Sequence, residues 1–299
     1  MTFNSAQCLA LFLAAARLTG QQNQKLRIKM GFLDRINHTI DINHSLVCVG
    51  LDPLPERFPS EVRGKPNAVF EFNKNIIDAT ADLVCAYKPQ IAHYHALEAE
   101  NQLSLTIEYI QKNYPEIPVI LDAKRGDIGS TAEQYAKEAF ERYGADAVTV
   151  NPYMGVDTIK PFTQYADKGV ILLCRTSNAG AAAIQNLLVG KRYLYEVIAE
   201  KAVTEWNAHN NILLVVGATN PEELKHIRYL TGDTTLLVPG LGAQGGNVEA
   251  TVTNGLNSQK KGMIVNSSRG ITYASENSDF KKAARQATIK LRGQINQYR

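Results

Sequence analysis

Residues Pro118–Asp127 read PVILDAKRGD. The first four are apolar, and they lead directly into a cluster of charged residues that begins at Asp122. The apolar residues are continuous rather than alternating, which is typical of a strand buried on both faces of a parallel sheet. Similar runs recur from Ser45 onward, at Leu46–Leu51, Leu83–Lys88, Ala145–Val150, Gly169–Cys174, Ile212–Gly217, Thr235–Pro239 and Met263–Asn266. We therefore predict eight parallel strands, a pattern that disfavours hairpins.

Segments with helical character separate these strands. Asn220-Pro221-Glu222-Glu223 predicts a helix start, and Ser130-Thr131-Ala132-Glu133 matches a capping box. Eight strand–helix units over about 250 residues favour a (β/α)8 TIM barrel over a doubly wound sheet. The dinucleotide-binding pattern GxGxxG does not follow Leu46–Leu51, which favours the barrel further. We predict an α/β fold with a single barrel domain over residues 30–299.

Composition excludes several classes of protein. The chain has 299 residues, 44% hydrophobic and 20% charged, which rules out collagen, coiled coils and wholly disordered chains. Its formal net charge of +3 is small and scattered, so bulk electrostatics do not indicate nucleic-acid binding. Cys8, Cys48, Cys85 and Cys174 are far apart and indicate a reducing, cytoplasmic compartment. Neither CxxC nor HExxH occurs, so spacing predicts no metal site.

The first 29 residues differ from the rest of the chain. The apolar run Cys8–Ala16 is far shorter than the roughly 20 residues of a membrane span, and no basic segment precedes it as in a secretory signal. The polar stretch Gln21–Lys29 follows, and Gly31–Asp41 then has the pattern of a first amphipathic helix. We expect residues 1–29 to be a poorly ordered extension, and we expect no membrane partner.

Charged side chains follow the first three predicted strands. Asp52 and Lys88 end the first two, although each alone also fits a turn or a surface residue. Asp122 and Lys124 are two positions apart in an extended segment, so they project to the same side, and Asp127 follows on the loop. A purely structural ion-pair network seldom recovers the cost of burial. We therefore expect Lys124 to be held cationic, ready to stabilise and protonate developing negative charge.

Two later strand ends have the composition of an anion site. Pro239–Gly246 (PGLGAQGG) offers backbone N–H groups without obstruction by Cβ atoms, and Asn266–Gly270 (NSSRG) adds hydroxyls and a guanidinium. TIM barrels commonly bind phosphate after strands seven and eight, which is where these segments lie. The glycines also suit a loop that closes over its ligand. After the fifth strand, Arg175–Gly180 offers short polar groups that fit the amide edge of a heterocycle.

The segment Asp122–Thr131 (DAKRGDIGST) resembles the DxKxxDIxxT signature of the orotidine 5′-phosphate decarboxylases. Other segments resemble the longer, type 2 bacterial branch of that family in order and spacing: Leu51-Asp52-Pro53, Tyr87-Lys88-Pro89-Gln90, Thr176-Ser177-Asn178, Gly240–Gly246 and Asn266–Gly270. The resemblance covers roughly Gly31 to Leu291. It implies conversion of orotidine 5′-monophosphate into uridine 5′-monophosphate and carbon dioxide, the last step of de novo UMP synthesis, without a metal or an organic cofactor.

The resemblance also implies roles for individual residues. Lys124 would donate the proton to C6 of the pyrimidine, with Asp122 beside it. Asp127 and Thr131 would act across the interface of a homodimer, with Thr131 at the ribose. The remaining implied roles belong to Lys88 and Asp52 at the charged array and the ribose hydroxyls, Ser177 at the pyrimidine, and Gln244 and Arg269 at the phosphate.

Three other functions remain open at this point. A related barrel decarboxylase or epimerase acts on a sugar phosphate with magnesium and shares the DxKxxD pattern. A Schiff-base aldolase would use Lys124 or Lys88 as its nucleophile, but it requires a neutral amine, which flanking acids oppose. A non-catalytic phosphosugar-binding protein would use the charged residues only as an ion-pair network.

Overall fold

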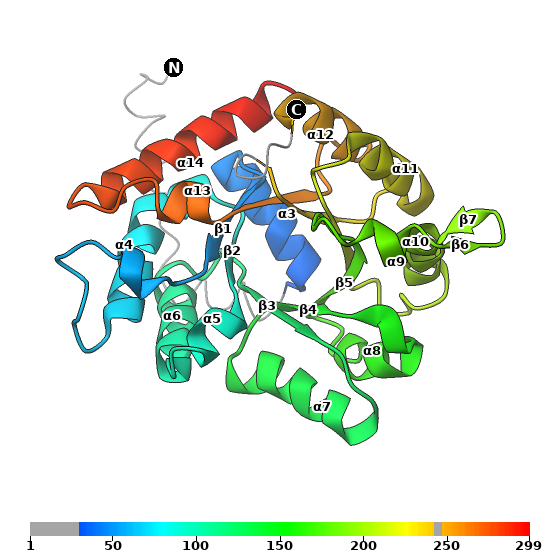
Figure 1. Cartoon of the computed structure of the whole chain (residues 1–299), viewed down its shortest axis with the longest axis horizontal. Coiled ribbons are helices and arrows are strands. Elements are labelled where there is room, and N and C mark those ends of the chain that lie inside the picture. Colours follow the sequence, from blue (N-terminus) through cyan, green and yellow to red (C-terminus); the bar gives the residue numbers. More distant parts are fainter. Residues whose placement is uncertain (1–29, 242–246) are drawn as a thin grey trace, which may run out of the picture.

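The computed structural model describes residues 30–241 and 247–299. Eight parallel strands form the central sheet in the order β2-β1-β10-β9-β8-β5-β4-β3 (Figure 1). Isolated parallel bridges join Tyr87 to Val119 and Gln90 to Asp122, so the two ends of this order also meet and the sheet closes into a barrel. The strands are β1 Val47–Leu51, β2 Ala86–Pro89, β3 Ile120–Arg125, β4 Ala147–Val150, β5 Gly169–Arg175, β8 Ile212–Val216, β9 Leu236–Pro239 and β10 Met263–Ser267.

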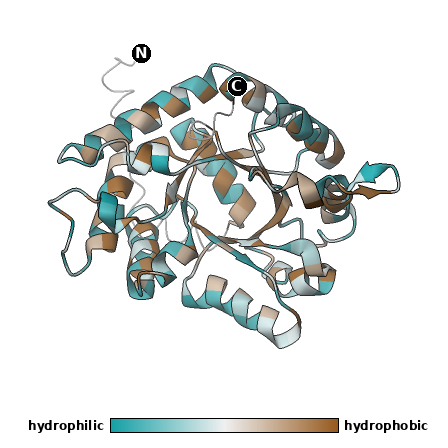
Figure 2. Cartoon of the chain, viewed as in Figure 1, coloured by the Kyte–Doolittle hydropathy of each residue, from teal (hydrophilic) through white to brown (hydrophobic). Residues whose placement is uncertain are grey.

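The eight predicted strands are confirmed, with small shifts at their ends. β2 begins later than predicted because Leu83 belongs to a short 3-10 helix, Ala81–Leu83. Every residue of β1, β2, β4, β8 and β10 is buried, which explains why their sequences are apolar without alternation. Figure 2 shows these hydrophobic strands at the centre of the molecule, enclosed by helices with hydrophilic outer faces.

Helices surround the barrel. They are α3 Phe32–Asn43, α4 Ala68–Thr80, α5 Ile91–His95, α6 Glu100–Asn113, α7 Gly129–Lys137, α8 Val156–Thr163, α9 Ala182–Gln185, α10 Leu194–Thr204, α11 Pro221–Thr231, α12 Val248–Gly255, α13 Arg269–Thr272 and α14 Phe280–Asn296. Most of them connect successive strands, as expected of a (β/α)8 barrel.

Helix α3, predicted at Gly31–Asp41, covers the amino-terminal end of the barrel. Its Phe32 ring contacts the first residue of β5, where a Cβ on Gly169 would lie 2.4 Å from the ring. The guanidinium of Arg35 donates a 2.6 Å hydrogen bond to Asp146, just before β4, and both side chains are buried. A pocket lies at the opposite end of the barrel, where the strands have their carboxyl ends.

Two local predictions differ from the structure. The predicted helix start at Asn220 is confirmed, but the capping box at Ser130–Glu133 is wrong, because α7 begins at Gly129 and Ile128 is its N-cap. A short antiparallel hairpin, β6 Leu188–Val189 and β7 Arg192–Tyr193, lies outside the barrel, although the strand pattern disfavoured hairpins. Both features belong to the connections between strands, where burial does not determine the sequence.

The extension expected at residues 1–29 lies outside the described residues. Cys48, Cys85 and Cys174 are free and buried, and burial raises the pKa of Cys48 and Cys174 to about 12, so these thiols act as apolar core groups. Over residues 30–241 and 247–299, none of the helices has the length and apolar character needed to cross a membrane.

Candidate active site

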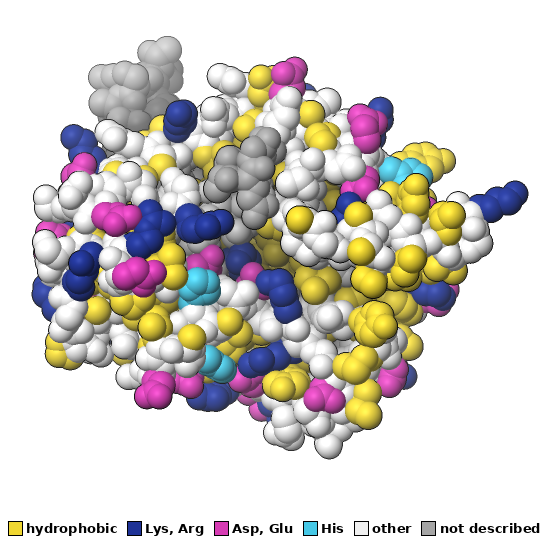
Figure 3. Space-filling model, in the orientation of Figure 1, with side chains coloured by type: hydrophobic (Ala, Val, Ile, Leu, Met, Phe, Trp, Pro, Cys, Tyr) yellow, Lys and Arg dark blue, Asp and Glu magenta, His cyan; other side chains and the backbone are white. Residues whose placement is uncertain are grey.

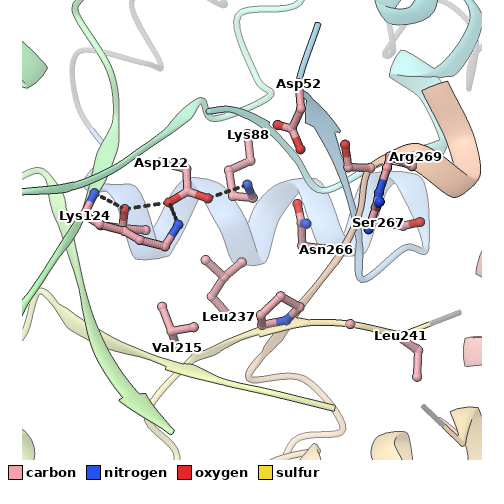
Figure 4. Close-up of a pocket in the computed structure, with 14 residues that line it drawn as sticks. Asp52, Lys88, Asp122, Lys124, Val215, Leu237, Leu241, Asn266, Ser267 and Arg269 are labelled. Atoms are coloured by element: carbon pink, nitrogen blue, oxygen red, sulfur yellow. Dashed lines mark hydrogen bonds and ion pairs between the residues drawn. The ribbon is translucent and has the colours of Figure 1, made fainter. Parts of the chain in front are cut away.

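A pocket of about 240 Å³ lies at the carboxyl ends of the barrel strands. Residues at or just after the ends of β1, β2, β3, β4, β8, β9 and β10 line it (Figure 4). In TIM barrels this end of the sheet carries the active site, because the loops that follow all strands converge there. The position of the pocket is therefore consistent with the prediction that the functional side chains lie at the carboxyl ends of the strands.

Asp122 lies between two lysines in this pocket. Its Oδ2 accepts a 2.8 Å hydrogen bond from Nζ of Lys88, and its Oδ1 accepts a 2.6 Å hydrogen bond from Nζ of Lys124 (Figure 4). Asp122 and Lys88 are buried, whereas the side chain of Lys124 is 46% exposed. Lys124 is therefore the member of the array that a ligand can reach.

The surroundings of Asp122 and Lys88, the two buried members of this charged array, favour the ionised form of each side chain. Burial alone would raise the pKa of Asp122, but the positive charges of Lys88 and Lys124 and their hydrogen bonds hold it well below its usual value. Burial alone would lower the pKa of Lys88, but the charges of Asp122 and Asp52 raise it above its usual value. Asp122 is an anion and Lys88 a cation at neutral pH.

The backbone at Lys124 is not a regular strand. Lys124 has a φ of 47°, in the left-handed region, and the pairing of β3 with β4 shifts between Leu121 and Arg125. The ion pair between Asp122 and Lys124 confirms the prediction that their side chains project to the same side. The geometry that produces it is a bulge, however, rather than the two-residue alternation of an extended strand.

Two buried acceptors in the pocket have no hydrogen-bond partner among residues 30–241 and 247–299. They are Oδ1 of Asp52 and Oδ1 of Asn266, and neither atom is accessible to solvent. A buried polar atom without a partner costs free energy, and both side chains line the pocket, so each would gain by turning this atom toward a ligand hydroxyl group. Of these two residues, only Asp52 has a role predicted from the sequence, although Asn266 also lies at the end of a predicted strand.

Arg269 lines the pocket as the first residue of α13, beside Ser267 and Ser268. Figure 4 places Lys124 and Arg269 on opposite sides of the pocket. Val215 and Leu237 form an apolar surface between them, which the sequence did not distinguish from the barrel core. Gln244 lies outside the described residues.

Three other predicted site residues do not line this pocket. Asp127 is partly buried, and its carboxylate accepts a 2.8 Å hydrogen bond from the backbone N–H of Ile128. Thr131 is exposed on α7. Ser177 follows β5, and its backbone lies against Gly217, where an added Cβ would approach it to 3.0 Å. The sequence predicts two acids, Asp122 and Asp127, around Lys124. Within one chain the structure instead has one acid, Asp122, between two lysines.

The chain matches the family described as "Orotidine 5'-phosphate decarboxylase / HUMPS family" over residues 45–287. It belongs to this family. Among curated proteins it is 58% identical to an orotidine 5'-phosphate decarboxylase of Cellvibrio japonicus over 269 residues, which cover 89% of this chain and 98% of that protein. The family match, over residues 45–287, spans all eight barrel strands and the pocket residues that they carry.

Solved structures of the family have the same fold. The structure of Leishmania donovani OMP decarboxylase is 40% identical with a TM-score of 0.77, and the match covers 89% of this chain and 99% of that one. The structure of Leishmania donovani UMP synthase is 42% identical with a TM-score of 0.80. That match covers 90% of this chain, which spans only 56% of the longer protein.

The substitution Asp122→Asn should remove a pH-dependent part of the stability. At neutral pH it leaves Lys88 buried without its anionic partner, so we expect the free energy of unfolding to fall by about 3 kcal/mol. The folded pKa of Asp122 lies below the unfolded value of about 3.9. The stabilisation is therefore complete above that unfolded value and is lost as the pH falls through the folded pKa.

Urea unfolding of both proteins from neutral to acidic pH measures this difference. The gap in unfolding free energy should narrow below about pH 4. Asp41→Asn, which removes an exposed partner of Lys261, is the control and should cost less than about 1 kcal/mol at every pH. A gap for Asp122→Asn that does not change with pH contradicts the proposed ionisation.

Proposed function

We propose that this chain decarboxylates orotidine 5′-monophosphate to uridine 5′-monophosphate and carbon dioxide, the last step of de novo UMP synthesis, without a cofactor. The observation that carries the proposal is the ion pair of Lys124 with Asp122 at a partly exposed position of the pocket. The names of the relatives support the reaction, and the charged array supports the chemistry.

The reaction needs a cation beside C6. When the bond from C6 to the carboxylate breaks, the electron pair stays on C6 in the plane of the ring, where no π system delocalises it. The ammonium of Lys124 stabilises this charge and then donates its proton to C6, and Lys124 regains a proton from solvent. Asp122 accepts a 2.6 Å hydrogen bond from Nζ of Lys124 and so fixes the position of this group.

The two ends of the pocket fit the two ends of a nucleotide. Arg269, opposite Lys124, would bind the phosphate with Gln244. Asp52 and Lys88 would bind the ribose hydroxyls and hold the array. Asp52 supports this role because it lines the pocket and its Oδ1 has no hydrogen bond within the part of the chain that the structure describes. Ser177 would bind the pyrimidine. Phosphate contacts far from C6 can raise the rate, because remote binding energy aligns the ring.

We also propose a homodimer in which Asp127 and Thr131 act in the site of the partner subunit. Neither residue lines the pocket of its own chain, and both lie close to Ile128, which is 60% exposed. Tyr153, after β4, is 81% exposed, and Met154 and Val156 beside it are exposed too. Figure 3 shows hydrophobic side chains gathered on this side of the molecule, around α8. A second copy of the chain would cover them.

The barrel, residues 30–299, would be the complete catalytic unit, and residues 1–29 an extension that it does not need. The match to the Cellvibrio japonicus protein supports this division, because 269 residues of this chain account for 98% of that protein. The free, buried cysteines of the barrel support a reducing compartment, which we propose to be the cytoplasm.

The central test follows the loss of orotidine 5′-monophosphate absorbance with purified protein in EDTA. The wild type should consume the substrate, and Lys124→Ala should be slower by roughly 10²–10³-fold or more, because the stabilising cation is gone. Lys201→Ala, an exposed lysine on α10 paired with Glu205, is the control and should leave the rate unchanged.

No turnover by folded wild-type protein in EDTA, with turnover restored by magnesium, would support the metal-dependent sugar-phosphate decarboxylase instead. Tight nucleotide binding without turnover in either condition would support the non-catalytic reading.

The shared site predicts complementation between inactive variants. Lys124→Ala and Asp127→Ala should each be inactive alone. A hybrid dimer has one site with both Lys124 and the partner subunit's Asp127, so an equal mixture should recover up to about a quarter of the wild-type rate. No recovery after demonstrated subunit exchange would place Asp127 in the site of its own chain.

Shortening the chain to begin at Met30 should leave activity and stability unchanged. The described barrel begins at residue 30, and α3 contacts the barrel through Phe32 and Arg35. Steady-state kinetics and thermal unfolding of the shortened and full-length proteins provide the measurement. Loss of folding or activity in the shortened protein would show that residues 1–29 belong to the functional unit.

A further inference from the structure

Thr149 on β4 makes three hydrogen bonds to the segment that carries the lysine. Its side-chain oxygen accepts one from the backbone N–H of Ala123 and one from that of Lys124, both at 2.9 Å. Its hydroxyl donates a third, also 2.9 Å, to Oδ1 of Asp122. Thr149 is 1% exposed and lines the pocket, and it is not among the site residues predicted from the sequence.

The direction of these bonds is fixed by chemistry. A backbone N–H can only donate, and an ionised carboxylate can only accept. The oxygen of Thr149 therefore uses its lone pairs for the two N–H groups and its single hydrogen for Asp122. The hydroxyl has no alternative orientation that satisfies all three partners.

The hydroxyl replaces part of the strand pairing at the bulge. Leu121 pairs with Val148 and Arg125 pairs with Val150, so residues 122–124 lie opposite Thr149 alone. Lys124 has a φ of 47°, a conformation that costs free energy in a residue with a side chain and persists only where surrounding contacts hold it. The bond from the Lys124 N–H to Thr149 is such a contact.

We propose that Thr149 is a positioning residue for the reaction, whose hydroxyl fixes the backbone of Lys124 and the carboxylate of Asp122 relative to each other. The inference rests on the proposed decarboxylase function. It adds Thr149 to the charged array, because Oδ1 of Asp122 accepts one hydrogen bond from Thr149 and another from Nζ of Lys124. One neutral hydroxyl thus holds the backbone of Lys124 directly and its ammonium through Asp122.

Thr149→Val and Thr149→Ser separate the hydroxyl from the shape of the side chain. Valine keeps the shape and loses the hydroxyl, so Lys124 loses its fixed backbone. We expect kcat to fall by roughly 10²-fold, the cost of a displacement of about 1 Å at a reacting group. KM should change by less than about threefold, since the phosphate contact at Arg269 is unaffected. Thr149→Ser should restore kcat to within about threefold of the wild type.

A second readout does not depend on turnover. In Thr149→Val the backbone N–H groups of Ala123 and Lys124 lose their acceptor, so hydrogen exchange of a peptide spanning these residues should be faster than in the wild type. Thr149→Ser should keep the wild-type exchange. Thr288→Val is the matched control, because Thr288 is also buried and its hydroxyl donates a 2.8 Å hydrogen bond to the backbone carbonyl of Ala284 on α14, outside the pocket.

Each outcome decides between the interpretations. Wild-type kcat in folded Thr149→Val, or failure of folded Thr149→Ser to restore kcat, overturns the positioning role while leaving the decarboxylase function intact. An inactive wild type overturns the proposed function itself, and the inference with it. If Thr149→Val does not fold, Thr149→Cys, which offers only a weak acceptor of similar size, takes its place with the same expectations.

Discussion

The buried carboxylate of Asp122 is the constraint on which the pocket depends. An anion in this position is tolerated because Lys88 and Lys124 contact its two oxygens, and each cation is in turn stabilised by it. Asp52, acting on Lys88 through its charge, continues the series, so negative and positive groups alternate from Asp52 to Lys124. The alternation ends in a cation that is partly exposed, where an anionic substrate can meet it.

The barrel brings these charges together without long side-chain reach. Asp52 follows β1, Lys88 lies on β2 and Asp122 on β3, and these three strands are neighbours once β2 and β3 meet. That contact consists of isolated bridges rather than a continuous ladder. The ion pair between Lys88 and Asp122 therefore also joins the two strands at the point where the barrel closes.

Burial on both faces explains why the strands could be predicted from the sequence. Val148 and Leu214 are fully buried, and a position buried on both faces of the sheet requires an apolar residue, so the residue type indicates the strand. The bulge at Lys124 could not be predicted, because it depends on a hydroxyl from β4 that lies far along the chain. Val215 and Leu237 could not be predicted as pocket residues either, because an apolar side chain that lines a pocket cannot be told from one in the core by residue type alone.

Catalysis by charge requires that the charges be in place before the substrate arrives, since their reorganisation would otherwise add to the barrier. The array satisfies this requirement within one chain, with Asp122 already bonded to both lysines. A charged group in place of Thr149 would also hold Lys124, but it would change the net charge of the array. A threonine hydroxyl supplies two acceptors and one donor without charge, so it can fix the backbone of Lys124 without changing the net charge of the array.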